Sequence, residues 1–217
     1  ARLELEVALC HALDGCRAHL LSQPEQQLTC AELKQLSHWT HQLCDHVARA
    51  YLTGEQEFWG LSLSIDARVL VPRPDTGSLV ECALERLPNA PASTQARALQ
   101  ALDLGTGSGA IALAIAQERR DVEIIACDIS AECLAVAETN SRALGLPISL
   151  QLSDWFERID QRFDVIVANP PYIDSEDSHL FQLQAEPRAA LVAPNRGLAD
   201  LQAIIERAPA HLHRDGW

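Results

Sequence analysis

A glycine-rich turn between two apolar segments constrains the fold of this 217-residue chain most strongly. Residues 98–104 have the character of a buried strand and residues 110–117 that of an apolar helix. Glycines at such a turn let the backbone approach a ligand, and the amides that start the helix then point toward it. The pattern predicts a strand, a ligand-binding turn and a helix, in that order. The residues of the turn are Gly105, Thr106, Gly107, Ser108 and Gly109.

Strands and helices alternate through the second half of the chain. Hydrophobic periodicity predicts strands over residues 123–127, 148–152 and 163–168, and a helix over residues 131–144. Alternation of this kind indicates a parallel sheet with helices on both faces. The fold class is therefore α/β, with a doubly wound, Rossmann-like domain over residues 76–217. Its other helices are expected at residues 76–87 and around Leu198, Leu201, Ile205 and Leu212.

The first part of the chain has a helical pattern. Thr29 and Glu32 have the spacing of a capping box at the start of a helix. Apolar residues then recur at intervals of three and four, and an earlier stripe has the same spacing. Two helices in succession predict a small helical domain over residues 1–53. The stripes comprise Leu3, Val7, Cys10 and Leu13, followed by Leu33, Leu36, Trp39, Leu43 and Val47.

Residues 54–75 carry the pattern of a β-hairpin that links these two parts. Apolar residues alternate with serines in the segment LSLSI, and a turn is expected directly after it at Asp66 and Ala67. Pro72 and Pro74 end the hairpin, because proline cannot donate a hydrogen bond to a neighbouring strand. The sequence therefore predicts a hairpin linker between the helical domain and the sheet.

Charge and hydropathy limit the classes of partner. The formal net charge of −13 disfavours non-specific binding to phosphate backbones, so no direct nucleic-acid contact is expected. No apolar run is long enough to span a membrane, and no signal-peptide pattern starts the chain, so a cytoplasmic protein is expected. The seven cysteines form no CxxC pair and suit buried free thiols in a reducing compartment.

One group of side chains resembles a set of metal ligands. His38, His41 and Asp45 share a face of the second expected helix. That face lies opposite the apolar stripe, so a solvated surface is the better interpretation. No metal site is therefore expected.

Acidic residues end or follow three of the expected strands. Asp103 precedes a GxGxG spacing that is one residue short of the dinucleotide motif, so a cofactor with an ammonium group fits better than a pyrophosphate. Asp128 ends the next strand, where an acid commonly accepts both hydroxyls of a ribose, although a helix cap is the alternative. Asp154 and Trp155 follow the third strand and suit an adenine ring, although Trp155 could instead belong to the core. Together these residues predict S-adenosylmethionine at the carboxyl edge of the sheet.

The last expected strand of the sheet ends in the motif Asn-Pro-Pro-Tyr. An amide nitrogen is a weak nucleophile, so a catalyst must hold it and stabilise the positive charge that develops as a methyl group arrives. The Asn169 side-chain oxygen and the Pro170 carbonyl can accept the two N–H groups of a planar amide. Pro171 stiffens the turn and Tyr172 offers an aromatic wall. The motif predicts methylation of an NH2 group by positioning, while alone it suits a proline-terminated strand equally well.

Five segments in order along the chain resemble the HemK/PrmC family of protein-(glutamine-N5) methyltransferases. They are YLTGEQEFWG, VLVPRPDT, LDLGTGSGAIALAIA, LSDWFE and NPPYI. The resemblance implies a helical domain that engages class-1 peptide chain release factors, a hairpin linker and a Rossmann-like, S-adenosylmethionine-dependent catalytic domain. It implies methylation of the glutamine in their Gly-Gly-Gln motif, which supports translation termination. It also implies that Asn169 contacts the cofactor and that Phe58, Arg73 and Thr76 help to close the site around the glutamine.

Two features depart from the family pattern. The acid that usually follows PRPDT is replaced by Gly77, so any contact made by that carboxylate is lost. The family also continues for several strands past the position at which this sequence ends, and the sequence contains no methionine. These features indicate a fragment whose C-terminal strands are missing and whose strand over residues 163–168 has an uncovered edge. We expect such a fragment to be unstable or to pair that edge.

Three other classes of protein share parts of this pattern. Adenine-N6 DNA methyltransferases also carry NPPY and flip their target base out of the stack, but the acidity of the chain and the lack of a basic segment disfavour them. A non-catalytic, cofactor-binding subunit is suggested by the missing strands. A nicotinamide dehydrogenase is disfavoured by the glycine spacing and by Asp103.

Overall fold

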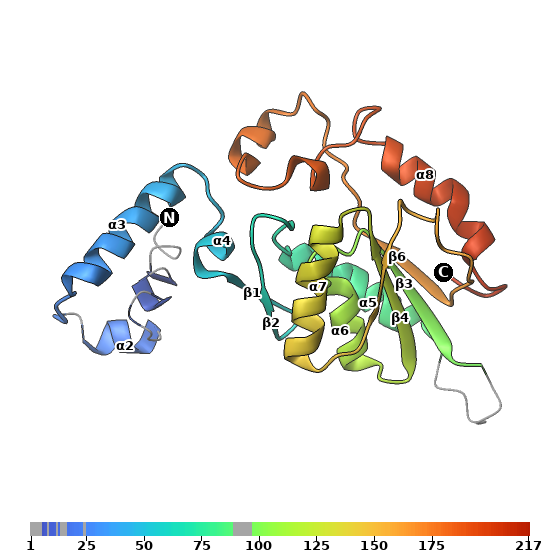
Figure 1. Cartoon of the computed structure of the whole chain (residues 1–217), viewed down its shortest axis with the longest axis horizontal. Helices are drawn as coiled ribbons and strands as arrows, with labels where there is room; N and C mark the ends of the chain where they lie inside the picture. Colours follow the sequence, from blue (N-terminus) through green and yellow to red (C-terminus); the bar gives the residue numbers. More distant parts are fainter. Residues whose placement is uncertain (1–5, 8, 12, 14–16, 24, 89–96) are drawn as a thin grey trace.

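The computed structural model describes residues 6–7, 9–11, 13, 17–23, 25–88 and 97–217, and the statements below refer to these residues. Figure 1 shows the helices α2 (Arg17–Ser22), α3 (Cys30–Cys44) and α4 (Arg49–Thr53) beside a sheet-containing part, with the hairpin β1–β2 between them. The chain therefore passes from a helical region through a hairpin into the sheet.

The N-terminal helices confirm the expected cap and only part of the expected stripe. Thr29 Oγ1 accepts a hydrogen bond from the Glu32 amide at 3.3 Å, and the Glu32 carboxylate accepts one from the Thr29 amide at 2.6 Å. Trp39 is buried, whereas Leu33 is 51% exposed, so the expected apolar stripe of α3 is only partly buried. The earlier expected stripe begins at Leu3, which lies outside the described residues.

The linker is a two-stranded antiparallel hairpin formed by β1 (Glu55–Phe58) and β2 (Leu61–Ser64). Its turn consists of Trp59 and Gly60, with φ values of 54° and 74°, and two positive φ values match the twist of the flanking strands. The apolar residues of LSLSI are buried and its serines are exposed, which confirms the alternation. The turn expected at Asp66 is also present, because the Asp66 carbonyl accepts a hydrogen bond from the Val69 amide at 3.1 Å.

Four parallel strands form the sheet in the order β5-β4-β3-β6. The chain adds strands outward on one side of β3 and then returns to place β6 on its other side. The bounds of the strands are β3 Leu99–Leu104, β4 Val122–Asp128, β5 Ser149–Leu152 and β6 Val165–Ala168. This order makes the crevice between the ends of β3 and β6 a topological switch point, where ligands of such sheets bind.

Helices cover both faces of the sheet, as expected for a doubly wound domain. Val80 of α5 and Ile111 of α6 pack in one apolar cluster with Ala101 of β3, while Ile204 of α8 packs in a second with Leu102. Neighbouring residues of β3 point to opposite faces, so the two clusters lie on the two sides of the sheet. The helices are α5 Gly77–Arg86, α6 Ala110–Glu118, α7 Ala131–Leu144 and α8 Ala199–Arg207, with short 3-10 turns η1 Pro74–Thr76, η2 Ser178–Leu183, η3 Arg188–Ala190 and η4 Ala208–His211.

The outer edge of β6 is not uncovered as the sequence led us to expect. The chain turns after η4, so its last residues run beside β6 and Leu212 lies past the end of α8 instead of within it. The Phe163 amide donates to the His211 carbonyl at 2.9 Å, and the Ile166 amide donates to the Trp217 carbonyl at 2.8 Å. These bonds satisfy part of the edge, because a parallel neighbour accepts the outward amides of the strand.

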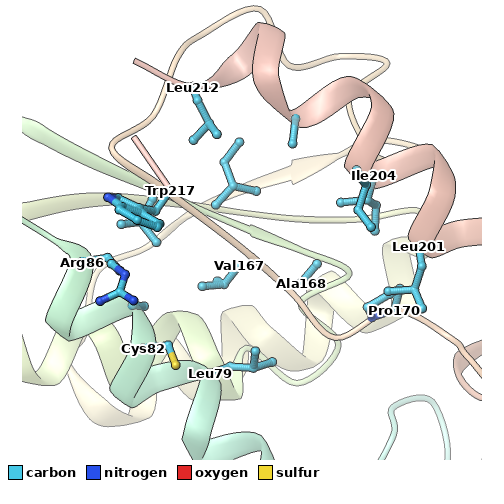
Figure 2. Close-up of a pocket in the computed structure, with 15 residues that line it drawn as sticks. Leu79, Cys82, Arg86, Val167, Ala168, Pro170, Leu201, Ile204, Leu212 and Trp217 are labelled. Carbon is cyan, nitrogen blue, oxygen red and sulfur yellow. The ribbon is translucent and has the colours of Figure 1, made fainter. Parts of the chain in front are cut away.

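An apolar cavity of about 400 Å³ remains beside β6, between α5 and α8. Figure 2 shows Leu79 and Cys82 on one side, Leu201 and Ile204 on the other, and Trp217 near Arg86. The Arg86 guanidinium carbon lies 4.6 Å from the centre of the Trp217 ring, a cation–π contact. The lining of this cavity is almost wholly hydrocarbon, so it offers few polar groups to bind a polar ligand.

Asn140 of α7 connects the hairpin to the glycine-rich turn. Its side chain is 1% exposed. Its Oδ1 accepts a hydrogen bond from the Ser64 amide at 2.7 Å, and its Nδ2 donates to the carbonyls of Ser64 at 3.1 Å and Ser108 at 2.9 Å. One buried amide therefore fixes β2 against the turn that precedes α6.

We predict that Asn140→Ala lowers the free energy of unfolding by about 2–3 kcal/mol, because it removes the partner of the Ser64 amide and carbonyl and of the buried Ser108 carbonyl. Thr139→Ala, a change at the exposed neighbouring position of α7, should alter it by less than about 0.5 kcal/mol. Urea denaturation followed by circular dichroism measures both. Equal stability of the two variants would contradict the connecting role of Asn140.

Candidate cofactor and substrate site

The glycine-rich turn has a backbone that glycine permits. The φ values of Gly105, Gly107 and Gly109 are 71°, 56° and 84°, in the left-handed region. A Cβ atom on Gly109 would stand 3.2 Å from Cβ of Ala137, so α7 packs tightly against the turn. The amides of Gly105 and Thr106 both donate to the Cys127 carbonyl at 2.9 Å. The turn is therefore rigidly held at the carboxyl ends of β3 and β4.

Asp103 lies beneath this turn at the end of β3. Its Oδ2 accepts hydrogen bonds from Thr106 Oγ1 at 2.7 Å and from the Ala112 amide at 3.3 Å. Its Oδ1 has no partner among the described residues. The pKa of Asp103 is raised to about 6, because the effect of burial is larger than the opposite effect of the hydrogen bonds from Thr106 and Ala112. One oxygen organises the turn, and the unpartnered oxygen fits the expectation of an acceptor for a cationic cofactor.

Asp128 ends β4 next to the same turn. Its Oδ2 accepts a hydrogen bond from the Gly107 amide and its Oδ1 one from the Ser130 amide, both at 2.9 Å. Ser130 is the N-cap of α7, because its Oγ accepts a bond from the Cys133 amide. The capping alternative for Asp128 is therefore not needed. Each carboxylate oxygen can accept a second bond, so ribose hydroxyls remain compatible with this arrangement.

The third strand end places an aromatic ring over the turn. A Cβ atom on Gly105 would lie 3.3 Å from the Trp155 ring, so a side chain there would require the indole to shift by a few tenths of an ångström. Asp154 is exposed and Trp155 is half-buried, with a φ of 43°. Ile129, which the sequence did not single out, is 69% exposed directly after Asp128. An exposed apolar side chain at this edge is suited to cover a planar ring. The position of Ile129 directly after the strand-end acid Asp128 is the sequence feature from which this role could have been predicted.

A second cavity, of about 470 Å³, lies where the Asn-Pro-Pro-Tyr motif faces the linker. Asn169 and Tyr172 line it from one side, and Arg73 and Thr76 from the other. Tyr172 is 60% exposed and makes a rim. The side-chain amide of Asn169 makes no hydrogen bond to any other described residue, so it is available for a ligand. The structure thus brings together four residues that the sequence placed around the glutamine.

Three other expected site residues have different surroundings. Pro170 is buried and lines the apolar cavity beside β6. Pro171 is half-buried and is not among the residues that line either cavity. Phe58 is 4% exposed in the apolar core under the hairpin, and it is not among the residues that line the second cavity. It was expected to close the site directly, but its position allows only an effect through the packing of the linker.

A buried carboxylate near this cavity was missed. Glu186 is 7% exposed; its Oε2 accepts a hydrogen bond from the Val71 amide at 3.3 Å, and its Oε1 pairs with the Arg73 guanidinium. Arg73 therefore has a protein partner and is not a free substrate ligand. The partners are separated by 113 residues, and a single glutamate before a proline gives no local pattern that would have revealed the pair.

The described part of the chain has neither a membrane-spanning helix nor a cluster of metal ligands. None of its helices is both long and apolar enough to cross a membrane. No three or more His, Cys, Asp or Glu side chains within it are grouped closely enough to hold a metal ion.

The fold and the strand-end site define an S-adenosylmethionine-dependent methyltransferase. Residues 73–190 match the family model of the methyltransferase small domain, and residues 1–54 match that of the PrmC N-terminal domain. The structure of the 16S rRNA N2 G1207 methyltransferase of T. thermophilus in complex with AdoMet and guanosine is 24% identical, with a TM-score of 0.50 over 73% of this chain and 38% of that chain. This likeness concerns the fold alone.

Curated relatives narrow the class to one family. The release factor glutamine methyltransferase of Yersinia pestis is 43% identical over 99% of this chain and 76% of its own length. That of Escherichia coli is 44% identical over 100% of this chain and 77% of its own length. The chain belongs to the family of release factor glutamine methyltransferases.

We predict that Asp103→Asn changes how stability depends on pH. The pKa of Asp103 is raised from 3.8 to about 6 in the folded protein, so its contribution is present below about pH 4 and is lost as pH rises to about 6. The wild type should therefore lose roughly 3 kcal/mol relative to the variant over this range. Urea denaturation at several pH values measures the difference in free energy of unfolding between wild type and variant. The contributions of the other carboxylates are common to both proteins and cancel in this difference. A constant difference would contradict the raised pKa.

Proposed function

We propose that the chain transfers the methyl group of S-adenosylmethionine to the side-chain amide nitrogen of the Gly-Gly-Gln glutamine in class-1 peptide chain release factors. The observation that carries this proposal is the register of the sheet. Leu104 pairs with Ala168, so the glycine-rich turn and Asn169 directly follow neighbouring strand ends. A cofactor held by the turn and an amide held by Asn169 would then lie next to each other at the switch point.

Several residues fit the cofactor. The turn from Gly105 to Gly109 would approach it closely, Asp103 has an unpartnered oxygen for an ammonium group, and Asp128 retains acceptor capacity for ribose hydroxyls. Trp155, with Asp154 beside it, and Ile129 would adjoin the adenine. When bound, S-adenosylmethionine supplies an electrophilic methyl group on a sulfonium.

The chain's own residues would act by orientation. The Asn169 oxygen and the Pro170 carbonyl would accept the two N–H groups of the glutamine, which turns the nitrogen toward the methyl group and stabilises its developing positive charge. Tyr172 would cover the amide plane at the rim. The glutamine nitrogen would accept the methyl group from the sulfonium, which would leave as the neutral thioether, and one amide proton would pass from the nitrogen to solvent. Most of the rate enhancement would come from positioning and exclusion of water.

The partner and the cellular site follow from the same proposal. The N-terminal domain, expected over residues 1–53, would engage the release factor, the hairpin over residues 54–75 would link it to the catalytic domain over residues 76–217, and the reaction would take place in the cytoplasm. The relatives' names and the match of residues 1–54 to the PrmC N-terminal domain support the protein partner. The net charge of −13 supports a protein substrate over a nucleic acid.

The first test incubates the protein with radiolabelled S-adenosylmethionine and one of three acceptors. These are a release factor, the same factor with its Gly-Gly-Gln glutamine changed to alanine, and duplex DNA. We expect label on the intact factor alone. Label on DNA would favour the adenine-N6 alternative, and cofactor binding without transfer to any acceptor would favour a non-catalytic subunit.

We predict that Asn169→Ala lowers kcat for release factor methylation by roughly 100-fold or more, because the glutamine nitrogen is no longer aimed at the methyl group. The affinity for S-adenosylmethionine, measured by calorimetry, should change far less. Gln202→Ala removes an amide from the exposed face of α8 and is the matched control, with no change in kcat expected. An Asn169→Ala variant with wild-type kcat would exclude this residue from catalysis.

A further inference from the structure

The segment after the motif, residues 177–191, is attached to the rest of the chain at its far end and at Glu186. At its far end the Leu191 carbonyl accepts hydrogen bonds from the amides of Tyr172 at 3.2 Å and Ile173 at 2.9 Å. Within it, Glu186 binds the Val71 amide and the Arg73 guanidinium of the linker. The segment therefore connects the catalytic motif directly to the linker.

Both attachments border the second cavity, which Asn169 lines. Arg73 and Asp75 line it from the linker, and Leu183 and Leu191 line it from residues 177–191. The Glu186 contacts thus hold two walls of one cavity together. If they were lost, the linker and the segment could separate, and the width of the cavity would no longer be fixed.

The same segment also contacts the helical region. Gln184 Nε2 donates a hydrogen bond to the Asp45 carbonyl at 3.3 Å, and the Phe181 ring stands edge-on to the His46 ring with centroids 5.4 Å apart. Glu186 lies two residues beyond Gln184 in the sequence. The segment is therefore positioned where the helical domain, the linker and the motif meet.

Stability alone is a weak reason for a buried ion pair at this place. The Glu186 side chain is 4% exposed and the Arg73 side chain 42% exposed, so the carboxylate bears a desolvation cost that the pair largely offsets. Apolar residues of similar size usually stabilise such a position as well or better. What an ion pair with a further backbone hydrogen bond supplies is a defined geometry.

We propose that Glu186 is a positioning residue for amide methylation. It fixes Val71 and Arg73 of the linker against residues 177–191, and so sets the width of the cavity in which Asn169 and Tyr172 orient the target glutamine. Arg73 then acts through the shape of the cavity, as the partner of Glu186. This inference rests on the proposed function and adds a residue that acts on the glutamine and not on the cofactor.

The chain offers a closely matched control. Asp164 is 5% exposed, pairs with the half-exposed Arg97 and accepts a hydrogen bond from the Gln100 amide at 2.8 Å. It is thus also a buried carboxylate held by one arginine and one backbone amide. It precedes the first residue of β6, at the end of the strand opposite the motif. Asp164→Asn and Glu186→Gln therefore remove the same kind of interaction from a distant place and from the cavity.

The experiment compares wild type, Glu186→Gln and Asp164→Asn, each at a temperature where circular dichroism shows it folded. With a release factor as substrate, Glu186→Gln should lower kcat/KM by roughly 10- to 100-fold, since a displacement of about 1 Å at a reacting group has an effect of this size. Its Kd for S-adenosylmethionine should stay at the wild-type value. Asp164→Asn should keep wild-type values of both quantities.

Other outcomes separate the inference from the proposed function. If wild type methylates the factor and Glu186→Gln matches Asp164→Asn in kcat/KM, Glu186 has only a structural role. If Glu186→Gln weakens cofactor binding equally, its effect is not specific to the glutamine cavity and the inference is also wrong. Failure of wild type to methylate the factor counts against the proposed function instead. Should Glu186→Gln not fold, the double variant Arg73→Gln/Glu186→Gln, which leaves no unpaired charge, is expected to show the same loss.

Discussion

The parallel pairing of β3 with β6 is the constraint on which the site depends. Residues 101–104 of β3 pair in order with residues 165–168 of β6, so both strands end at the same level. The glycine-rich turn follows one strand, and Asn169 follows the other. A shift of this register by one residue would exchange the side chains on the two faces of β6, so the packing of Val165 and Val167 in one apolar cluster and of Ile166 against the other favours the observed register.

Polar contacts then join the linker to this sheet at separate places. Asn140 binds β2 to the glycine-rich turn, and Glu186 binds Val71 and Arg73 to the segment beyond the motif. At the tip of the hairpin, Trp59 Nε1 donates a hydrogen bond to Glu118 of α6 at 3.0 Å. Apolar packing can slide by small amounts, whereas a hydrogen bond loses most of its energy with small errors in distance and angle. The linker is therefore held in one orientation relative to the glycine-rich turn and to the cavity lined by Asn169.

Local patterns were sufficient for most of the fold. The bounds expected for α7 agree with the structure, the capping box at Thr29 is present, and the strands start or end within about two residues of their expected positions. The strand ends also led directly to Asp103, Asp128 and Asn169, because parallel strands bring their carboxyl ends to one edge. Information of this kind is carried by residues close together in the sequence.

The remaining features depend on pairs that no local pattern links. Asn140 lies 76 residues from Ser64, and Glu186 lies 113 residues from Arg73, so neither contact could be inferred from spacing. Phe58 illustrates the opposite error, since an aromatic residue in a family motif suggested a ligand contact although alternation along β1 places it in the core. The pairing at the edge of β6 was missed because it depends on where the chain turns after η4.

Gly77 stands where the family usually has an acidic residue after PRPDT, and its surroundings do not require a glycine. A Cβ atom there would lie 3.5 Å from the Trp59 ring, an ordinary contact, and its φ of −57° is open to any residue. Neither space nor backbone conformation therefore requires the glycine. The first turn of α5 contains no acid, so the favourable interaction of a carboxylate with the helix N-terminus is absent. The arginine of PRPDT nevertheless has a carboxylate partner, because Glu186 reaches it from residues 177–191. The geometry of the linker thus depends on a contact with a residue far away in the sequence and not on a neighbour in sequence.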